Sequence, residues 1–401
     1  MLAIPKTKSA TFAEIQQRLD NSPGTNTWAG ASVNVSTAMQ QATVYTCVRI
    51  LSETIAALPI KAQTKNKDGR WMDSDHDALG LLAEPNEWQT QHDLISMWVA
   101  WSELRGNAFS FKAIGGGKVR YLYPLESTGV DVEQLSDWSL RYSVHGDNGF
   151  SGDYGAGEIM HLRNFGTAGY EGVSTIGKLR NDIGLAQRAK EHGARVFTNG
   201  ASAGRWIKAT GVKTAQDALA MQNQYDSKYA GAQNSGKTPV MWGGSELVEI
   251  GMNAQDAQLL ETLKFQKSEL ASIFGVPGFL VNDAEKSTTW GTGLETITKT
   301  FMRFSLRPRL NRIVSTLGRE LLTKQERVGT RFAFETDAFT MGGFKEVMEA
   351  GERAIVNGIL SPNEVRDIVN RNPREGGEIY RESPNSVPEG AGAEDADETL
   401  S

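Results

Sequence analysis

One stretch of the sequence has the residue types and spacing of a nucleotide-binding motif. In GAQNSGKTPV, residues 231–240, the spacing G-x-x-x-x-G-K-S/T is matched by Gly231, Gly236, Lys237 and Thr238. In a phosphate-binding loop of this kind, backbone N–H groups and the lysine hold the phosphates of ATP or GTP. A nucleotide hydrolase that uses Lys237 is therefore the first hypothesis.

The elements expected around this motif stand in the wrong order for a phosphate-binding loop. Such a loop joins a buried strand to the N-terminus of a helix, whose amides and dipole hold the phosphates. Here a polar helix, expected over residues 214–229, comes before the motif. Pro239 and the strand-like VMW follow, and Gly243 cuts short any helix after it. We therefore interpret the motif as a glycine-containing turn from a helix to a strand.

Three other features could carry chemistry, and each has a structural interpretation that we favour. A cluster of possible metal ligands comprises Asp73, Asp75, His76 and Asp77. Acidic residues also suit a helix start, where they oppose the helix dipole, and we prefer this interpretation. We expect His161 to be a hydrogen-bonded strand residue rather than a catalyst, and Cys47 to be a buried structural thiol. The sequence thus predicts no active site, no metal and no cofactor.

The composition is that of a soluble globular protein with two or three domains. The 401 residues are 39% hydrophobic and 22% charged. With a formal net charge of −6, the chain is not basic overall, as many nucleic-acid-binding proteins are. A local nucleic-acid-binding site is still compatible with this charge. The single cysteine excludes an intrachain disulfide. We expect neither a transmembrane helix nor a secretion signal, because no apolar run is long enough.

The first half of the chain has an α+β pattern. Residues 1–36 are polar and are expected to form a weakly ordered arm. A helix is expected to start near Ala38, with Ser36 or Thr37 as its cap, and to end at Pro59. A hairpin is expected over 60–72, turning at KDGR, and a helix over 90–105. Short strands then follow as far as about residue 165.

The second half is mainly helical. Helices are expected over 175–197, where Ile176 to Ala194 mark a face of small and apolar residues, and over 255–274. A compact insert, residues 205–250, separates them. The loop after the second helix is unusually long, which is often a sign of function. A long helix over 294–325 is expected to bend near 304–308, because Pro308 lies inside it. A strand, two or three short helices over 342–372, one of them starting at LSPNEV, and an acidic tail from Ser383 complete the chain.

Several stretches, taken together and in order, resemble portal proteins of long-tailed bacteriophages. They are VYTCVRILSETIAALPI, LLAEPNEWQT, LRGNAFSF, LYPLESTGVDV, GEIMHLRNF, GVSTIGKLRNDIGLA, ELASIFGVPGFLV and LRPRLNRI. The resemblance covers about residues 38–325. It implies the portal fold, an α+β fold with wing, stem, clip and crown regions that assembles into a ring, usually of twelve subunits. Double-stranded DNA passes through the central channel of such a ring during packaging and ejection.

The resemblance assigns the segments of this chain to parts of the portal fold. The assignments are a flexible N-terminal arm at 1–36, wing at 37–175, stem helix at 176–200, clip at 201–253, second stem helix at 254–276, tunnel loop at 277–292, a long bent helix with a return to the wing at 293–341, crown at 342–382 and a disordered acidic tail at 383–401. The implied partners are the large terminase subunit, the capsid or scaffold protein and head–tail adaptors, without a membrane. The implied location is the virion, and the host cytoplasm during assembly.

The resemblance also implies three groups of functional residues. In the tunnel loop Lys286, Ser287, Thr288 and Thr289 are expected to contact DNA phosphates transiently. On the second stem helix the channel or a neighbouring subunit is expected to contact Glu261, Phe265, Ser268 and Ser272. In the clip Lys228 and Lys237 are expected to lie where the packaging motor docks. A head–tail adaptor ring is a further alternative, although adaptors are usually much smaller than this chain.

Overall fold

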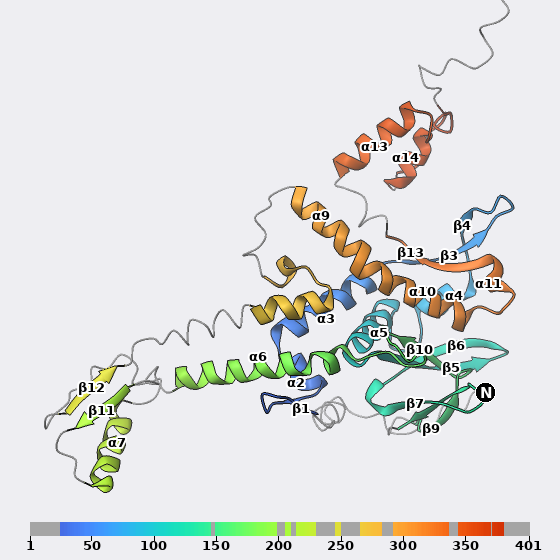
Figure 1. Cartoon of the computed structure of the whole chain (residues 1–401). Coiled ribbons are helices and arrows are strands. Elements are labelled where there is room, and N and C mark those ends of the chain that lie inside the picture. Colours follow the sequence, from blue (N-terminus) through green and yellow to red (C-terminus); the bar gives the residue numbers. More distant parts are fainter. Residues whose placement is uncertain are drawn as a thin grey trace, which may run out of the picture. The chain divides into compact units, whose positions relative to one another are not determined.

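The computed structural model of the chain describes residues 25–145, 149–198, 205–209, 214–229, 245–249, 265–282, 292–336, 344–369 and 371–380. The chain divides into two compact units, residues 1–334 and 335–401. The first unit combines helices with small antiparallel sheets (Figure 1). The mixed composition agrees with the α+β expectation.

The helices of the first unit are α2 (Val35–Met39), α3 (Ala42–Ala56), α4 (Asp77–Ala83), α5 (Gln91–Arg105), α6 (Thr175–Thr198), α7 (Ala215–Tyr229), a helix over 265–274, α9 (Thr292–Thr300), α10 (Arg307–Leu321) and α11 (Glu326–Gly329). Short 3₁₀ turns cover Ser127–Gly129 and Gly278–Val281, and a π-helical segment covers Phe301–Leu306. In α5 the fold follows the sequence closely. Thr90 and Asp93 form a capping box at its start, and Gly106 ends it with a φ of 85°.

The strands are β1 (Thr25–Asn26), β2 (Ser32–Val33), β3 (Ile60–Lys65), β4 (Trp71–Ser74), β5 (Asn107–Gly115), β6 (Lys118–Leu125), β7 (Val130–Gln134), β8 (Leu140–Val144), β9 (Gly152–Gly155), β10 (Ile159–Arg163), β11 (Arg205–Ala209), β12 (Ser245–Glu249) and β13 (Thr330–Phe334). They form sheets in the orders β1-β2, β10-β5-β6, β11-β12, β13-β3-β4 and β7-β8-β9. The predicted hairpin at KDGR is confirmed as β3-β4, and its turn uses Gly69 with a φ of 82°.

One hydrophobic core joins helices that are far apart in the sequence. Fully buried members include Leu51 of α3, Ile95 of α5, Ile183 of α6, Phe274 of the helix 265–274 and Leu317 of α10. Burying each such side chain stabilises the fold by about 1.5–3 kcal/mol. The common core therefore fixes the helix 265–274 and α10 against the same central pair, α3 and α5.

The single cysteine belongs to this core. Cys47 is fully buried on α3, and burial raises the pKa of its thiol to about 12. A thiol reacts as the thiolate, so the raised pKa makes Cys47 inert while the protein is folded. The interpretation of Cys47 as a buried structural thiol is confirmed.

The N-terminal part differs from the expectation of a weakly ordered arm. Residues 25–36 form the β1-β2 hairpin and the start of α2. Arg188 of α6 donates hydrogen bonds to the carbonyls of Ala29 and Gly30. A Cβ at Gly184 would lie 2.5 Å from Thr27 Oγ1, so the glycine lets the hairpin approach α6. The expectation of a weakly ordered arm over 1–36 is therefore wrong for residues 25–36. Contacts with α6 order this polar segment.

The first predicted helix is also divided. Neither Ser36 nor Thr37 is the cap, because Asn34 caps α2 and accepts a hydrogen bond from Thr37 N at 2.8 Å. Thr37 instead completes the capping box. The helix expected from Ala38 to Pro59 is in fact α2 followed by α3.

On α6 the expected small-residue face is buried as far as Ala189, but Ala194 is exposed and does not belong to it.

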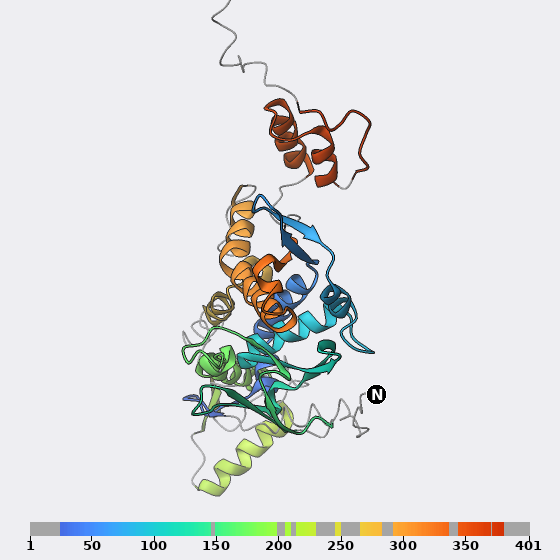
Figure 2. The same cartoon turned by 90° about the vertical axis from the view of Figure 1, so that its right-hand side faces the viewer.

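The long helix around Pro308 changes its hydrogen-bond register. Figures 1 and 2 show α9, the π-helical segment and α10 as one continuous run. Within the π-helical segment Arg307 N–H donates to Met302 O, five residues back. Pro308 then stands in the first turn of α10, where a missing N–H costs little. The proline that was expected to bend the helix near 304–308 is thus accommodated by a π-helical turn.

The helix predicted before the phosphate-loop match is confirmed. The helix α7 ends at Tyr229, and the next described element is the strand β12, which pairs with β11. The motif itself, residues 231–238, lies outside the described residues, as does the expected strand at VMW. A helix therefore ends shortly before the motif, where a phosphate-binding loop would instead follow a buried strand.

The second unit contains α13 (Phe344–Val356) and α14 (Pro362–Ile368). The predicted start at LSPNEV is confirmed, since Ser361 and Glu364 form a capping box before α14. A Cβ at Gly351 would lie 2.6 Å from Val365 Cγ1, which shows how closely the two helices pack. The acidic tail from Ser383 lies outside the described residues.

Candidate functional site

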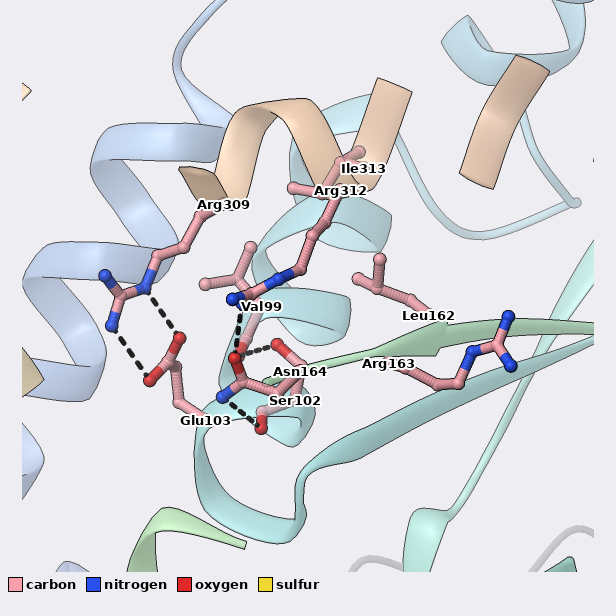
Figure 3. Close-up of a pocket in the computed structure, with 9 residues that line it drawn as sticks. All are labelled: Val99, Ser102, Glu103, Leu162, Arg163, Asn164, Arg309, Arg312 and Ile313. Carbon is pink, nitrogen blue, oxygen red and sulfur yellow. Dashed lines mark hydrogen bonds and ion pairs between the residues drawn. The ribbon is translucent and has the colours of Figure 1, made fainter. Parts of the chain in front are cut away.

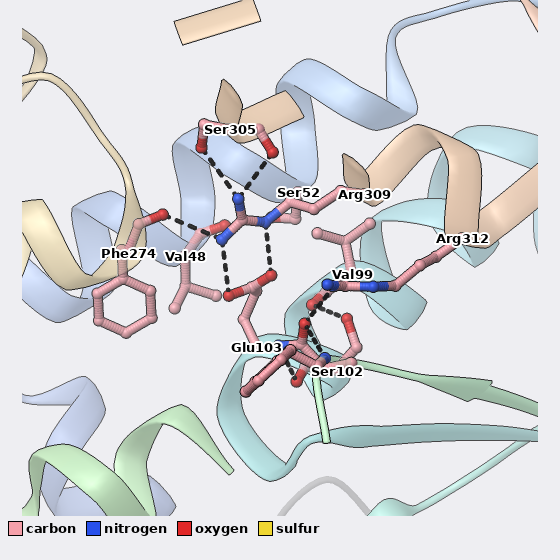
Figure 4. Close-up of polar contacts among 11 residues, drawn as sticks. Val48, Ser52, Val99, Ser102, Glu103, Phe274, Ser305, Arg309 and Arg312 are labelled. Atoms are coloured by element: carbon pink, nitrogen blue, oxygen red, sulfur yellow. Dashed lines mark hydrogen bonds and ion pairs between the residues drawn. The ribbon is translucent and has the colours of Figure 1, made fainter. Parts of the chain in front are cut away.

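A buried ion pair lies where α10 crosses the end of α5. Arg309 Nε donates to Glu103 Oε1 at 2.7 Å, and Nη2 donates to Oε2 at 3.2 Å (Figure 4). The side chains of Glu103 and Arg309 are 2% and 17% exposed. A buried charge needs a partner of opposite sign and further hydrogen bonds, and this bidentate geometry supplies both.

The same guanidinium also binds two other backbone segments. Nη2 donates to Phe274 O at 3.0 Å, and Nη1 donates to Ser305 O at 2.8 Å and to Ser305 Oγ at 2.9 Å. Phe274 is the last residue of the helix 265–274, so its carbonyl has no partner within that helix. Arg309 therefore joins α5, the end of the helix 265–274 and the π-helical segment. We call these residues, with Glu103, the Arg309 junction.

Gly275 makes the close approach at the junction possible. Its φ of 69° lies in the left-handed region that ends many helices, and its N–H donates to Ser272 O at 2.9 Å. A Cβ at Gly275 would lie 2.8 Å from Ser305 Oγ. Both the backbone conformation and the space thus favour glycine.

The Arg309 junction holds the two segments that flank residues 283–291. The segment before this stretch is the helix 265–274 with the turn to Asn282, and the segment after it is α9 with the π-helical turn. Lys267 Nζ also donates to Asn282 O at 2.8 Å. Fixing both flanks defines where the predicted tunnel loop, residues 277–292, leaves and re-enters the fold.

A second polar cluster lies beside the junction, around a small cavity (Figure 3). Arg312 Nη1 donates to Asn164 Oδ1 at 2.6 Å, and Asn164 Nδ2 donates to Ser102 O at 3.1 Å. This chain of bonds joins α10 to the end of β10 and to α5. Farther along α10, Glu320 Oε2 forms a buried ion pair with Lys112 Nζ of β5 at 2.5 Å.

His161 is a structural residue of the neighbouring sheet. Its ring nitrogens contact Asn107 Oδ1 at 2.9 Å and Tyr142 Oη at 3.3 Å. Burial, with the nearby charges of Arg163 and Arg319, lowers the pKa of His161 to about 3. The imidazole is therefore neutral at pH 7, and the predicted hydrogen-bonded strand residue is confirmed.

The possible metal ligands near residue 75 have other partners. Asp73 forms an ion pair with Lys61 at 3.0 Å and Asp77 with Lys118 at 2.6 Å. His76 Nδ1 accepts a hydrogen bond from Ala78 N and caps α4. The favoured interpretation, acidic residues at a helix start, is confirmed for Asp77 and is wrong for Asp73, which lies on the strand β4. In the described ranges, no three His, Cys, Asp or Glu side chains group as a metal site would require.

The structure locates only part of the predicted functional residues. Outside the described residues lie Lys286, Ser287, Thr288, Thr289, Glu261 and Lys237. Phe265 and Ser272 are exposed on the helix 265–274, and Ser268 is partly buried. Lys228 is exposed on α7. The structure thus brings Phe265, Ser268 and Ser272 onto one helix, adjoining the Arg309 junction that the sequence did not reveal.

None of the helices, over the residues that the structure describes, combines the length and apolar character needed to span a membrane. The described residues of the first unit form several small sheets and helices around a buried polar junction.

Comparison with known proteins identifies the class to which this fold belongs. Residues 42–370 match the family described as "Phage portal protein". The match covers most of the chain, so the chain belongs to the phage portal protein family.

Two curated relatives give the same family, and a solved structure shares the fold. The chain is 31% identical to the "Probable portal protein" of Streptomyces phage phiC31, over 88% of this chain and 80% of the relative. It is 30% identical to the "Portal protein" of Enterobacteria phage HK97, over 89% and 85%. It also shares its fold with a chain in "Neck of native GTA particle computed with C12 symmetry", with a TM-score of 0.59, 20% identity and coverage of 84% and 92%.

Proposed function

We propose that this chain assembles into a closed ring at the unique vertex of a phage capsid, and that the channel of this ring passes double-stranded DNA during packaging and ejection. Membership of the portal family supports this proposal. A ring of twelve subunits is supported by the similar neck structure, which was computed with C12 symmetry. A closed ring also has a physical rationale, because a heterologous interface repeated around an axis leaves no unpaired surface.

The observation that carries the proposal is a set of large apolar side chains that this chain leaves exposed. Phe265 is 66% exposed, Ile273 is 47% exposed and Phe304 is 70% exposed. They lie on the two segments held together by the Arg309 junction. Large exposed apolar side chains are found at interfaces between proteins, and a neighbouring subunit would cover these three.

The tunnel loop is proposed to contact the DNA in the channel. Lys286 is its cation, and Ser287, Thr288 and Thr289 add hydroxyl groups that can bind phosphate oxygens. One lysine per subunit gives a sparse ring of positive charge, which allows DNA to slide. The helix 254–276, with Glu261, Ser268 and Ser272, is proposed to border the channel or the next subunit. The Arg309 junction supports this arrangement, because it fixes both flanks of the loop.

The clip, residues 201–253, is proposed to dock the large terminase subunit. None of the described residues of α7 is buried, and a 15-residue helix is marginal in water without a packing partner. A partner protein would supply that packing. Lys228→Glu is expected to weaken motor docking and slow packaging in an in vitro packaging assay. An unchanged packaging rate would show that Lys228 is not part of the docking surface.

Other partners follow from a position at the capsid vertex. We propose the capsid or scaffold protein during assembly in the host cytoplasm, and head–tail adaptors in the finished virion. We also propose that the ring itself has no enzymatic activity. An ATPase assay tests this point, since turnover that is abolished by Lys237→Ala would establish a nucleotide site.

Negative-stain imaging and native mass spectrometry of the purified protein test the main proposal. The expected result is a ring with a central channel and a mass near a twelvefold multiple of the 43.8 kDa chain. A protein that stays monomeric at concentrations well above those of imaging would refute the ring.

A further inference from the structure

A groove on the outer side of α10 has a lining made of polar and cationic side chains alone. Its volume is about 370 Å³, and it is lined by Arg163, Asn311, Arg312, Ser315, Thr316 and Arg319. Five of these residues belong to α10, and Arg163 comes from the end of β10. Residues 312, 315, 316 and 319 recur at helical spacing, so they share one face of α10. We call this feature the arginine groove.

The positive charge of the groove is only partly neutralised. Arg163 Nη1 donates to Gly169 O at 3.0 Å, and Arg312 donates to Asn164 as described above. Neither arginine forms an ion pair within the described part of the chain. Arg319 contacts Glu320 Oε1 at 3.0 Å, but Glu320 is also bound to Lys112. Cations therefore outnumber carboxylates here, in a chain whose net charge is −6.

The charge of Arg312 is partly buried and lies near a second cation, so a bound anion would stabilise it. Burial, together with the nearby charge of Arg309, lowers the pKa of Arg312, while Glu103 opposes the shift. Figure 3 shows that the Arg312 guanidinium is turned toward Asn164, which holds it in place. An anion in the groove would offset the repulsion between the arginines and the cost of their partial desolvation.

The chemistry of the lining distinguishes between two kinds of anionic ligand. An acidic peptide usually adds an apolar anchor to its charges, and this groove has no apolar side chain to receive one. Arginine, serine, threonine and asparagine are the residue types that bind phosphate oxygens in nucleic-acid complexes. Arg312 and Arg319 are about 10 Å apart along the helix axis, so a ligand that contacts both must carry more than one phosphate group.

We propose that the arginine groove binds the phosphodiester backbone of nucleic acid without regard to base sequence. The site lies outside the tunnel loop of residues 277–292, and its binding chemistry does not depend on the ring. It gives the protein a second place of contact with DNA, on the body of the subunit.

The test measures binding of the full-length protein, as purified, to two fluorescently labelled DNA duplexes of unrelated sequence. Fluorescence anisotropy gives the Kd of each. Ser315→Glu places a carboxylate in the groove at an exposed position, so the fold should be retained. We expect Kd to rise about tenfold for both duplexes. Thr64→Glu, at an exposed threonine on β3, makes the same charge change elsewhere and should leave Kd unchanged.

A salt titration adds a second measure that does not depend on one variant. The double variant Arg163→Gln, Arg319→Gln should lower the slope of log K against log salt by about 0.9 for each DNA phosphate that the groove no longer neutralises. Poly-glutamate serves as the peptide probe. If poly-glutamate, and not DNA, binds in a manner sensitive to Ser315→Glu, the ligand is an acidic peptide and the proposal is wrong.

The proposal is also wrong if Ser315→Glu and wild type bind DNA equally, or if wild type binds no DNA. Imaging of the same preparations separates this result from the proposed function. If Ser315→Glu forms normal rings and binds DNA as wild type does, only the proposal for the arginine groove is refuted. Binding that is sensitive to Ser315→Glu in a protein that forms no rings would support the groove and refute the ring.

Discussion

Arg309 and Glu103 are 206 residues apart in the sequence, yet they form a bidentate ion pair in the interior of the first unit. The pair is one part of the Arg309 junction, in which the same guanidinium binds Phe274 O and Ser305. Desolvation of two charges offsets much of their attraction, so the pair adds little net stability. Its value is positional, because it sets the helix 265–274 against α10.

Removal of one partner of this pair should be costly. In Arg309→Met the carboxylate of Glu103 stays buried without a counter-charge, and we expect a loss of about 3–5 kcal/mol in the free energy of unfolding. Denaturant unfolding followed by circular dichroism measures it. Glu103→Leu combined with Arg309→Met should recover part of the loss. A matched control is Arg141→Met, which breaks the exposed pair with Glu133 and should cost at most about 1 kcal/mol.

Gly275→Ala should destabilise the same region by another route. The left-handed φ of Gly275 costs a non-glycine residue about 1–2 kcal/mol, and its Cβ would also press on Ser305 Oγ. The thermal midpoint should fall. Gly193→Ala is the control, since a Cβ there meets nothing within 4 Å on α6 and alanine favours a helix. Equal midpoints for the two variants would contradict the steric account of the junction.

His161 should make stability depend on pH on the acid side. The pKa of a histidine in the unfolded chain is about 6.5, and that of His161 in the folded protein is about 3. Between these values the unfolded chain binds the proton more readily, so stability falls as the pH is lowered from about 6.5 toward 3. At pH 4.5 the loss should be about 3 kcal/mol.

A comparison with His161→Gln isolates this effect from that of the carboxylates. Both proteins share the acidic groups, so the difference between their unfolding free energies should shrink as the pH falls from 7 to 4.5. Denaturant titrations at several pH values provide the measurement. A difference that stays constant across this window would mean that His161 does not carry the pH dependence.

Phe265→Glu should prevent ring assembly without unfolding the subunit. Its side chain is 66% exposed, so the change removes little packing within the chain but places a charge in the proposed interface. Native mass spectrometry should detect smaller species, with an unchanged thermal midpoint for the dissociated subunit. Phe165→Glu is a matched control at 69% exposure. Loss of rings in both variants would argue that exposure alone, and not the helix 265–274, accounts for the effect.

Lys286→Ala should leave rings intact while it changes the rate of DNA packaging or the amount of DNA retained. The lysine supplies the positive charge of the predicted tunnel loop. An in vitro packaging assay with preformed rings measures both quantities. Glu285→Ala removes the neighbouring charge of opposite sign and should not reproduce the defect. Failure of Lys286→Ala to assemble would instead assign the loop a structural role.

Local signals in the sequence were sufficient for much of the fold. Thr90 and Gly106 delimit α5, the KDGR turn gives β3-β4, and Ser361 starts α14. In each case the interaction that ends or starts the element joins residues only a few positions apart, so the local sequence pattern was enough to predict it. The resemblance to portal proteins likewise rested on stretches that follow one another along the chain.

The remaining features depend on interactions between distant residues. The β1-β2 hairpin is polar in sequence and is ordered by Arg188, about 160 residues away. Pro308 indicated a disturbed helix, but a π-helical turn is defined by the bond from Arg307 to Met302, which no composition rule predicts. Glu103 and Arg309 look like ordinary helix residues until the fold brings them together. The Arg309 junction therefore could not be derived from spacing.

The burial of Cys47 has a practical consequence for experiments on this protein. It is the only thiol in the chain, and it lies in the core of α3 with its reactivity suppressed. A cysteine introduced at an exposed position such as Trp138 would then be the one fast-reacting group on each subunit. Dyes or spin labels can thus be attached singly while the native cysteine is kept, and distances between neighbouring subunits can be measured on the otherwise unaltered protein.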